Sequence, residues 1–134
     1  MPQLAAPSQV PLPEPYISVI VPVYNEEDNL RELCDRLLRT LTGMGRPFEI
    51  IFIDDGSTDR SWEILREICL PYPGPKYPDH IQIRALQFHG NLGQHSALFA
   101  GFQAARGRVM VTLDADLQNP PEEIPRLVAK VEEG

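Results

Sequence analysis

Four short apolar runs alternate with helical patterns along this chain, and this alternation limits the possible fold more than any other feature. The runs are rich in β-branched residues and predict buried strands at 17–23, 48–53, 81–88 and 109–113. A helical pattern follows each strand, between Asn25 and Gly43, after Asp59, from Gly93 to Ala105 and from Pro120 to Val131. The order predicts an α/β fold, in which a mostly parallel sheet carries helices on both faces.

The predicted helices carry start signals. Asn25 and Asp59 are candidate N-caps, because their side-chain oxygens can accept bonds from free backbone amides. Pro120 or Pro121 can open the last helix without loss, since the first N–H groups of a helix have no intrahelical partner. Pro125 lies further along and is a candidate for a bend in that helix.

Two stretches fall outside the alternating pattern. Residues 1–15 are rich in proline and have neither a charged start nor an apolar run, so they predict a disordered leader rather than a signal peptide. The stretch Pro71–Asp79 holds several prolines and predicts an inserted loop. The remainder, 16–134, predicts one domain, and it is long enough to bury a core.

Composition argues against several functions. A formal net charge of −7 disfavours non-specific nucleic-acid binding, which needs a basic face. An acidic protein can still bind a phosphate ligand when a divalent metal mediates the contact. Cys34 and Cys69 lie in helical patterns without metal-ligand spacing, so we expect free thiols in a reducing compartment. No stretch approaches the roughly 20 apolar residues of a membrane span.

Polar clusters follow three of the four predicted strands. They are Tyr-Asn-Glu at 24–26, Asp-Asp-Gly-Ser at 54–57 and Asp-Ala-Asp at 114–116. In parallel sheets of this kind ligands bind at the carboxyl ends of the strands. The clusters therefore predict a binding pocket at that edge.

The acidic pair Asp114 and Asp116 can face one spot, because residues two apart in an extended strand point to the same side. Two hard carboxylate oxygens suit Mg²⁺ or Mn²⁺, and Gln118 could add a neutral oxygen. A cation held there could bridge a diphosphate and neutralise charge on a leaving group. The alternative is that one acid caps a helix and the other is a solvated turn residue.

The neighbouring acids Asp54 and Asp55 repel each other, which a fold tolerates when a ligand or a capped helix uses them. An Asp here could accept a hydrogen bond from a base N–H or a ribose hydroxyl. The alternative is turn chemistry, with Asp54 ordering its own loop. Tyr24 could stack on a nucleobase or be an ordinary half-buried tyrosine.

The turn at 90–97 joins a strand to a helix and contains two glycines, Gly90 and Gly93. Such a turn can receive an anion, but the spacing matches neither a P-loop nor the dinucleotide-binding glycine pattern. We interpret His95 as a polar residue of the first helical turn rather than a base, and the chain shows no Ser/His/Asp constellation.

Three longer strings contain these clusters: IVPVYNE at 20–26, IDDGSTD at 53–59 and DADLQNPPE at 114–122. Together they resemble the family 2 glycosyltransferases, which have the Rossmann-like GT-A nucleotide-diphospho-sugar transferase fold. The third string and GQHSA at 93–97 are similar to the branch that acts on polyprenyl phosphates, such as dolichol-phosphate mannose synthases and undecaprenyl-phosphate sugar transferases. The resemblance covers residues 17–134.

The resemblance implies roles for residues of all three strings. The residues implied to line the nucleotide pocket are Pro22, Val23, Tyr24 and Glu26, and those implied to hold the base are Ile53 and Asp55. The residues implied to meet the diphosphate and a Mg²⁺ or Mn²⁺ ion are Asp114, Ala115 and Asp116, with Gln118 completing the metal shell. Relatives often carry a basic residue where this chain has Gly90, which puts a phosphate or base contact from that loop in doubt.

The expected function is inverting, metal-dependent transfer of a sugar from a nucleotide-diphosphate sugar, expected to be a UDP-sugar, to undecaprenyl or dolichyl phosphate at the cytoplasmic face of a membrane. Enzymes of this branch need further strands and often membrane-anchoring helices after the last motif, so we expect this chain alone to be inactive. The free edge of strand 109–113 makes a homo-oligomer possible. The alternatives are a transferase that extends a glycan and a non-catalytic nucleotide-binding module.

Overall fold

A computed structural model describes residues 13–70 and 77–134 of the chain, so most of the predicted leader and of the Pro71–Asp79 loop lies outside the described residues. The strands are β1 (Ile17–Val23), β2 (Phe48–Asp54), β3 (Ile81–Gln87) and β4 (Val109–Thr112). The helices are α1 (Leu30–Gly43), α2 (Ser61–Cys69), α3 (Gln94–Ala104) and α4 (Ile124–Glu133), with a 3₁₀ turn, η1 (Pro121–Glu123), before α4. The predicted strand–helix alternation is confirmed.

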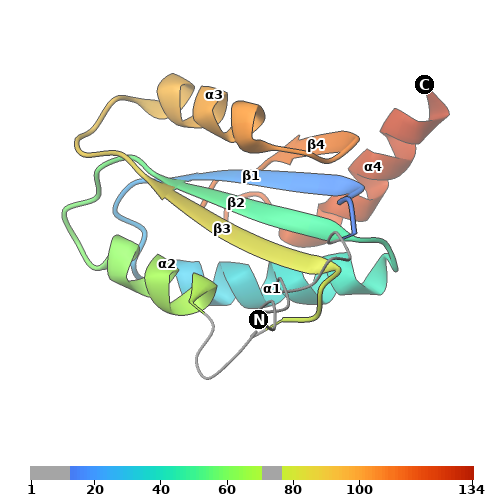
Figure 1. Ribbon diagram of the computed structural model, residues 1–134, viewed down its shortest axis with the longest axis horizontal. Coiled ribbons are helices and arrows are strands. Elements are labelled where there is room, and N and C mark those ends of the chain that lie inside the picture. Colours follow the sequence, from blue (N-terminus) through green and yellow to red (C-terminus); the bar gives the residue numbers. More distant parts are fainter. Residues whose placement is uncertain (1–12, 71–76) are drawn as a thin grey trace, which may run out of the picture.

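All four strands are parallel and lie in the order β3-β2-β1-β4. β1 and β2 occupy the centre of the sheet and are buried on both faces, which explains their nearly continuous apolar sequences. Figure 1 shows α1, α2 and α4 on one side of the sheet and α3 on the other. The predicted α/β class with helices on both faces is therefore confirmed.

The two faces of the sheet build two cores of unequal size. Alternate residues of β1 and β2, such as Val21 and Phe52, pack with α1, α2 and α4 in the larger core. Their neighbours Ile20 and Ile53 point to the other face, where they pack with Ala97 of α3. The sheet therefore holds α3 close to the carboxyl ends of β1 and β2.

The structure corrects two local predictions about helix starts, those for Asn25 and Pro125, and it bears out the capping bond predicted for Asp59. Asn25 does not cap α1, which begins at Leu30; Asn25 has a left-handed backbone (φ 52°) and bonds to another loop instead. Asp59 does accept a bond from the first amide of α2, at Ser61 (2.8 Å), although it lies one residue before the helix boundary. Pro125 lies in the first turn of α4, because η1 precedes that helix, so it interrupts no intrahelical hydrogen bond.

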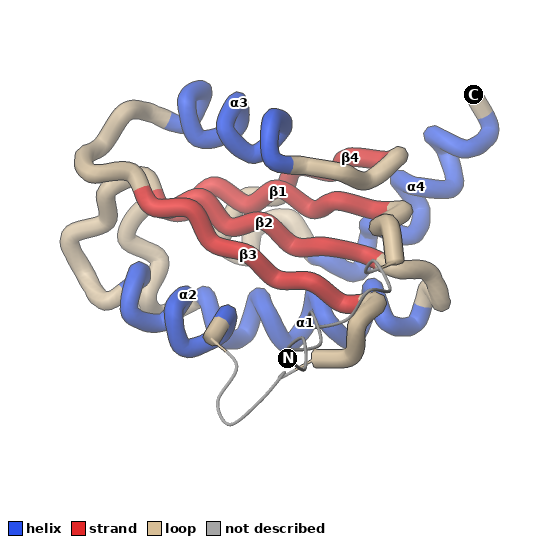
Figure 2. Tube along the Cα trace, in the orientation of Figure 1, coloured by secondary structure: helices blue, strands red, loops and turns tan. Residues whose placement is uncertain are grey.

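The loops that follow β1, β2 and β3 gather at one end of the sheet, on the left of Figure 2. The carboxyl ends of these strands meet there, as the parallel order requires. Over the described ranges, none of the helices has the length and apolar character needed to cross a bilayer.

Candidate functional site

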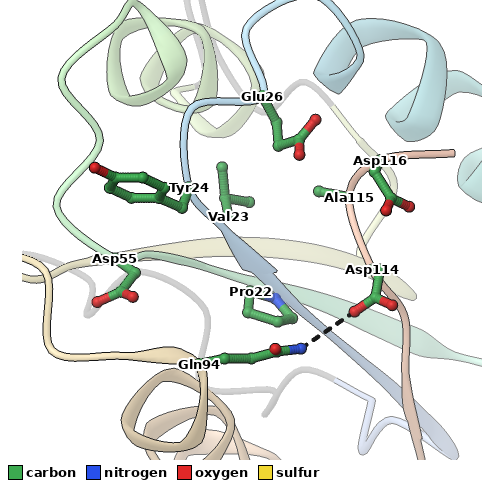
Figure 3. A pocket seen from close by; sticks show the side chains of 9 residues that line it. All are labelled: Pro22, Val23, Tyr24, Glu26, Asp55, Gln94, Asp114, Ala115 and Asp116. Atoms are coloured by element: carbon green, nitrogen blue, oxygen red, sulfur yellow. Dashed lines mark hydrogen bonds between the residues drawn. The ribbon is translucent and has the colours of Figure 1, made fainter.

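A pocket of about 290 Å³ lies at the carboxyl ends of the strands (Figure 3). Its walls come from the ends of β1 and β2, from the start of α3 and from the segment after β4. The lining residues are Pro22, Val23, Tyr24, Glu26, Asp55, Gln94, Asp114, Ala115 and Asp116. Eight of these nine were predicted from the sequence to belong to one site, and the structure brings those eight together.

The loops after β1 and β2 hold each other in place through side chains. The Asn25 carboxamide oxygen accepts bonds from the amides of Thr58 (2.8 Å) and Asp59 (3.2 Å). In return the Ser57 hydroxyl accepts a bond from the backbone amide of Asn25 (2.9 Å), and the Asp59 carboxylate accepts one from the backbone amide of Glu27 (3.2 Å). Much of the two motifs thus serves to hold the two loops together through hydrogen bonds to backbone amides.

Gly56 lets the loop after β2 approach the loop after β3. Its φ is +73°, in the left-handed region, and a Cβ built on it would lie 2.4 Å from the carbonyl carbon of Gly90. The neighbouring amide nitrogen of Asn91 would be only 2.6 Å away. A side chain at this position would therefore push the two loops apart.

Asp54 is fully buried at the end of β2 and is not one of the residues that line the pocket. Its Oδ1 accepts a bond from the Ser57 amide (3.3 Å), so it orders its own loop, as one of the two interpretations predicted. Its Oδ2 is buried, with no hydrogen-bond partner in the described part of the chain. Burial raises the pKa of Asp54, and the nearby charges of Asp59 and Asp55 add to that rise, against the lowering effect of the bonds to Ser57.

Asp55 lines the pocket and is only 5% exposed. The sequence suggested a base N–H or a ribose hydroxyl as its donor, but backbone amides already donate to both oxygens: Oδ1 accepts from the Leu92 amide (2.7 Å) and Oδ2 from the Gly93 amide (3.1 Å). A carboxylate has about four acceptor sites, so lone pairs remain for a ligand. Asp55 therefore ties the loop before α3 to the pocket whether or not it also contacts a base.

Asp114 and Asp116 are both exposed and both line the pocket, while Ala115 between them is buried. This agrees with the expected same-side arrangement, although β4 itself ends earlier, at Thr112. Gln118 is exposed and is not one of the lining residues; its backbone amide donates to Asp116 Oδ1 (3.0 Å). Its side chain remains a predicted metal ligand only.

Two other residues that the sequence analysis considered, Ile53 and His95, are not among the lining residues. The Ile53 side chain is fully buried in the core beneath α3, so only its backbone could approach a base. His95 is exposed and is not a lining residue, which agrees with its interpretation as a polar residue of the first turn of α3. Sequence reasoning missed Gln94 as a lining residue, although its place after the Gly93 turn was a usable signal.

The electrostatics of the pocket are one-sided. Glu26, Asp55, Asp114 and Asp116 line it, and no lysine or arginine among the described residues does. A phosphate group could not bind among four carboxylates without a cation to offset their charge. In the described residues, no three His, Cys, Asp or Glu side chains converge as a metal site. Two carboxylates with substrate phosphates and waters are nevertheless a usual Mg²⁺ shell, so the donor set fits such an ion.

The two acids Asp54 and Asp59 should give opposite pH dependence of stability. Because the folded pKa of Asp54 is raised, its contribution is present below its unfolded pKa and is lost as pH rises through the folded value. Asp54→Asn should therefore gain stability relative to the wild type as pH rises from about 3.5 to 7. Urea unfolding at several pH values measures this difference.

Asp59→Asn is the matched control for that series. Burial would raise the pKa of Asp59, but the bonds from Ser61 and Glu27 outweigh burial and hold the pKa below its usual value. Its contribution is therefore lost as pH falls, so this variant should lose stability relative to the wild type as pH rises. Parallel pH profiles for the two variants would contradict the assignment.

Residues 18–134 match the family model described as glycosyl transferase family 2. The chain is 50% identical over 119 residues to the undecaprenyl-phosphate 4-deoxy-4-formamido-L-arabinose transferase of Edwardsiella ictaluri. That match covers 89% of this chain and 34% of the relative, so the chain spans about a third of the length of that protein.

Solved structures share the fold. Staphylococcus aureus TarS 1–349 in complex with UDP-GlcNAc superimposes with a TM-score of 0.64 at 25% identity, covering 87% of this chain and 31% of that one. The mannosyltransferase PcManGT from Pyrobaculum calidifontis, in complex with GDP-Man and Mn²⁺, gives 0.66 at 22% identity, covering 94% and 35%. The expected GT-A architecture is thus confirmed, and the chain belongs to glycosyl transferase family 2.

Proposed function

We propose that this chain forms the donor-binding part of an enzyme that transfers a sugar from a nucleotide-diphosphate sugar to a polyprenyl phosphate. The observation that carries the proposal is the acidic pocket at the carboxyl ends of the strands, with Asp114 and Asp116 on one side and Tyr24 and Asp55 on the other. This arrangement offers a place for a metal-bound diphosphate at one end and for a base at the other.

At the acidic end, Asp114 and Asp116 would hold a Mg²⁺ or Mn²⁺ ion, and the ion would neutralise charge on the departing diphosphate. Gln118 lies two residues beyond Asp116 and is the candidate for a further oxygen. At the other end, Tyr24 is 46% exposed and could present its ring face to a base. Pro22, Val23 and the Glu26 carboxylate, which already accepts a bond from Asn29, complete the wall.

The reaction would be a single displacement at the anomeric carbon of the donor sugar. An oxygen of the acceptor phosphate forms the new bond to that carbon, and the bond to the nucleoside diphosphate breaks with inversion. The acceptor phosphate is already an anion near neutral pH, so the step needs no strong protein base. The role of the pocket is to position the donor and to keep water from the reacting carbon.

The acceptor and the sugar are supported by similarity alone. The relative at 50% identity is named for undecaprenyl phosphate and a formamido-arabinose, which makes a polyprenyl phosphate the favoured acceptor. TarS, solved with UDP-GlcNAc, supports a uridine nucleotide as the donor nucleotide. Because a polyprenyl phosphate is a lipid, we propose that the full-length protein acts at a membrane surface, expected to be the cytoplasmic face.

Calorimetry with UDP is the direct test of the donor site. We expect binding in the presence of Mn²⁺ or Mg²⁺ and at least a tenfold loss of affinity in EDTA, because no described residue that lines the pocket has a cationic side chain to replace the metal. Equal affinity with and without EDTA would rule out the metal-bridged site. GDP and ADP, run in parallel, determine which base is preferred.

A transfer assay tests the acceptor. The full-length protein, a divalent metal and labelled UDP-sugars are offered either undecaprenyl phosphate or an oligosaccharide. Labelled lipid supports the proposal, and labelled oligosaccharide would favour the glycan-extending alternative. Nucleotide binding without turnover on either acceptor would favour a non-catalytic module. The chain of 134 residues, assayed beside it, is expected to bind UDP but not to transfer sugar.

A further inference from the structure

The loop between β3 and α3 is fixed by a pocket residue rather than by its own side chains. Asp55 accepts bonds from two successive amides of that loop, at Leu92 (2.7 Å) and Gly93 (3.1 Å). Gly93 has a φ of +99°, a conformation that turns the chain sharply into α3. Asp55 therefore determines where the first residue of α3 begins.

That first residue is Gln94, which is exposed, and Figure 3 shows its side chain extending toward Asp114. Its Nε2 donates a hydrogen bond to Asp114 Oδ1 (3.3 Å). Among the described residues that line the pocket, Gln94 alone has an amide side chain, and it is neutral. It can thus hold one oxygen of Asp114 without cancelling the negative charge that a cation requires.

An exposed carboxylate such as Asp114 rotates freely unless a donor fixes it, and a metal ligand gains affinity when an outer group orients it. The contacts run from Asp55 through the Gly93 amide to Gln94 and then to Asp114. They link the end of the pocket proposed for the base to the end proposed for the metal.

We propose that Gln94 is a positioning residue that orients the Asp114 carboxylate for a metal-bound diphosphate, and that Asp55 determines the place of Gln94 through the amides of Leu92 and Gly93. The inference rests on the proposed function, because it assigns the diphosphate to the Asp114 end. It gives Asp55 a role that does not require contact with a base.

Pyrophosphate with Mn²⁺ separates this role from base recognition, since pyrophosphate has no base. Gln94→Met keeps the length of the side chain but removes the donor. Asp55→Asn replaces one of two acceptors with an amide that opposes a backbone N–H. Each variant should bind Mn²⁺-pyrophosphate about three- to tenfold more weakly than the wild type, the loss expected for one hydrogen bond. The fold-loss of Mn²⁺-pyrophosphate affinity in the double variant should be smaller than the product of the two single fold-losses, because both residues act through Asp114.

Side-chain amide signals of Gln94, assigned in ¹⁵N NMR spectra by their loss in Gln94→Met, provide a readout without any ligand. Asp55→Asn should shift these signals in the free protein, while Asp28→Asn, an exposed acid outside the pocket, should not. Far-UV circular dichroism checks that each variant is folded. Of these variants, Gln94→Met is expected to disturb folding least, because Gln94 is on the surface.

The two proposals fail in different ways. Wild-type protein that binds neither Mn²⁺-UDP nor Mn²⁺-pyrophosphate contradicts the proposed function, and the NMR comparison then decides the positioning role alone. Gln94 signals that are unchanged by Asp55→Asn would overturn the inference. So would an Asp55→Asn protein that loses UDP affinity yet keeps full affinity for Mn²⁺-pyrophosphate, since Asp55 would then act on the base only.

Discussion

Glu49→Ala is expected to lower the free energy of unfolding by about 3 kcal/mol, the lower end of the loss seen when one partner of a buried ion pair is removed. Glu49 lies in β2 with no exposed side-chain surface. Its Oε2 accepts bonds from the Ser18 hydroxyl (2.6 Å) and the Arg106 amide (2.7 Å), and its Oε1 accepts from Arg84 (2.7 Å). The variant would leave three donors without their acceptor and a cavity between them.

The same carboxylate joins segments that are distant in the sequence. Ser18 also accepts a bond from the Gly107 amide (2.8 Å), and Arg84 donates to the Ala104 carbonyl (2.6 Å). Glu49 thus fastens β1, β3 and the connection between α3 and β4 to the centre of the sheet. Gly107 belongs to this contact, because a Cβ there would lie 2.5 Å from the Ser18 hydroxyl. Loss of Glu49 should loosen all of these segments together.

The magnitude depends on how much of each charge is buried. Arg84 is 37% exposed, so water already screens part of its interaction with Glu49, and the expected loss is at the lower end for that reason. Burial alone would raise the pKa of Glu49, but the bonds from Ser18, Arg106 and Arg84 outweigh it and hold the pKa below its usual value. The contribution of Glu49 to stability is therefore lost as pH falls. The difference in the free energy of unfolding between Glu49→Ala and the wild type should become smaller toward pH 3.

Chemical denaturation of three variants measures this effect. Glu49→Gln keeps the volume and one acceptor oxygen, so it should lose less than Glu49→Ala. Glu122→Ala breaks an exposed pair with Arg36, which water screens, so it should cost much less stability than Glu49→Ala. Equal losses in Glu49→Ala and Glu122→Ala would show that the buried network does not stabilise the fold. Glu49 lies five residues before the end of β2, roughly 17 Å from the pocket edge, so UDP affinity of the folded variant should be unchanged.

The periodicity of the sequence was sufficient to predict the sheet. β1 and β2 are buried on both faces, so their apolar residues run without interruption and cannot be confused with an amphipathic helix. The intervening helices indicate parallel strands, and parallel strands place the three polar clusters at one edge of the sheet. Asp114 and Asp116 were predictable as a pair because two carboxylates two positions apart follow directly after a predicted strand.

Contacts between distant segments could not be predicted in this way. Asn25 has the chemistry of a helix cap, but its partners are amides of Thr58 and Asp59, more than 30 residues away. Asp55 can accept hydrogen bonds from a ligand, but in the fold it accepts them from the Leu92 and Gly93 amides. Local propensity gives the type of bond that a side chain can make, whereas the tertiary fold decides which partner is closer. The buried Glu49 is a third case, since a lone acid in an apolar strand does not reveal its partner.

Asp116→Ala is expected to abolish most of the metal-dependent part of UDP binding. Loss of a group that only orients a metal ligand typically costs about 10–100-fold in affinity, and loss of one of two protein ligands should cost at least as much. Asp116 lines the pocket with Asp114, and its Oδ1 already accepts a bond from the Gln118 amide, which leaves Oδ2 for a cation. Calorimetry with UDP and Mn²⁺, repeated in EDTA, separates the metal-dependent part from the rest.

Asp116→Asn and Asp28→Ala decide what the loss means. Asp116→Asn keeps the shape and one oxygen but removes the charge, so a large loss in both Asp116 variants assigns the effect to the carboxylate rather than to packing. Asp28 is exposed in the turn before α1, outside the pocket, so its removal changes the net charge by the same amount as Asp116→Ala. A loss in Asp28→Ala as large as that in Asp116→Ala would indicate a general charge effect. Retained Mn²⁺-dependent binding in Asp116→Ala would place the ion elsewhere and refute the acid pair as its site.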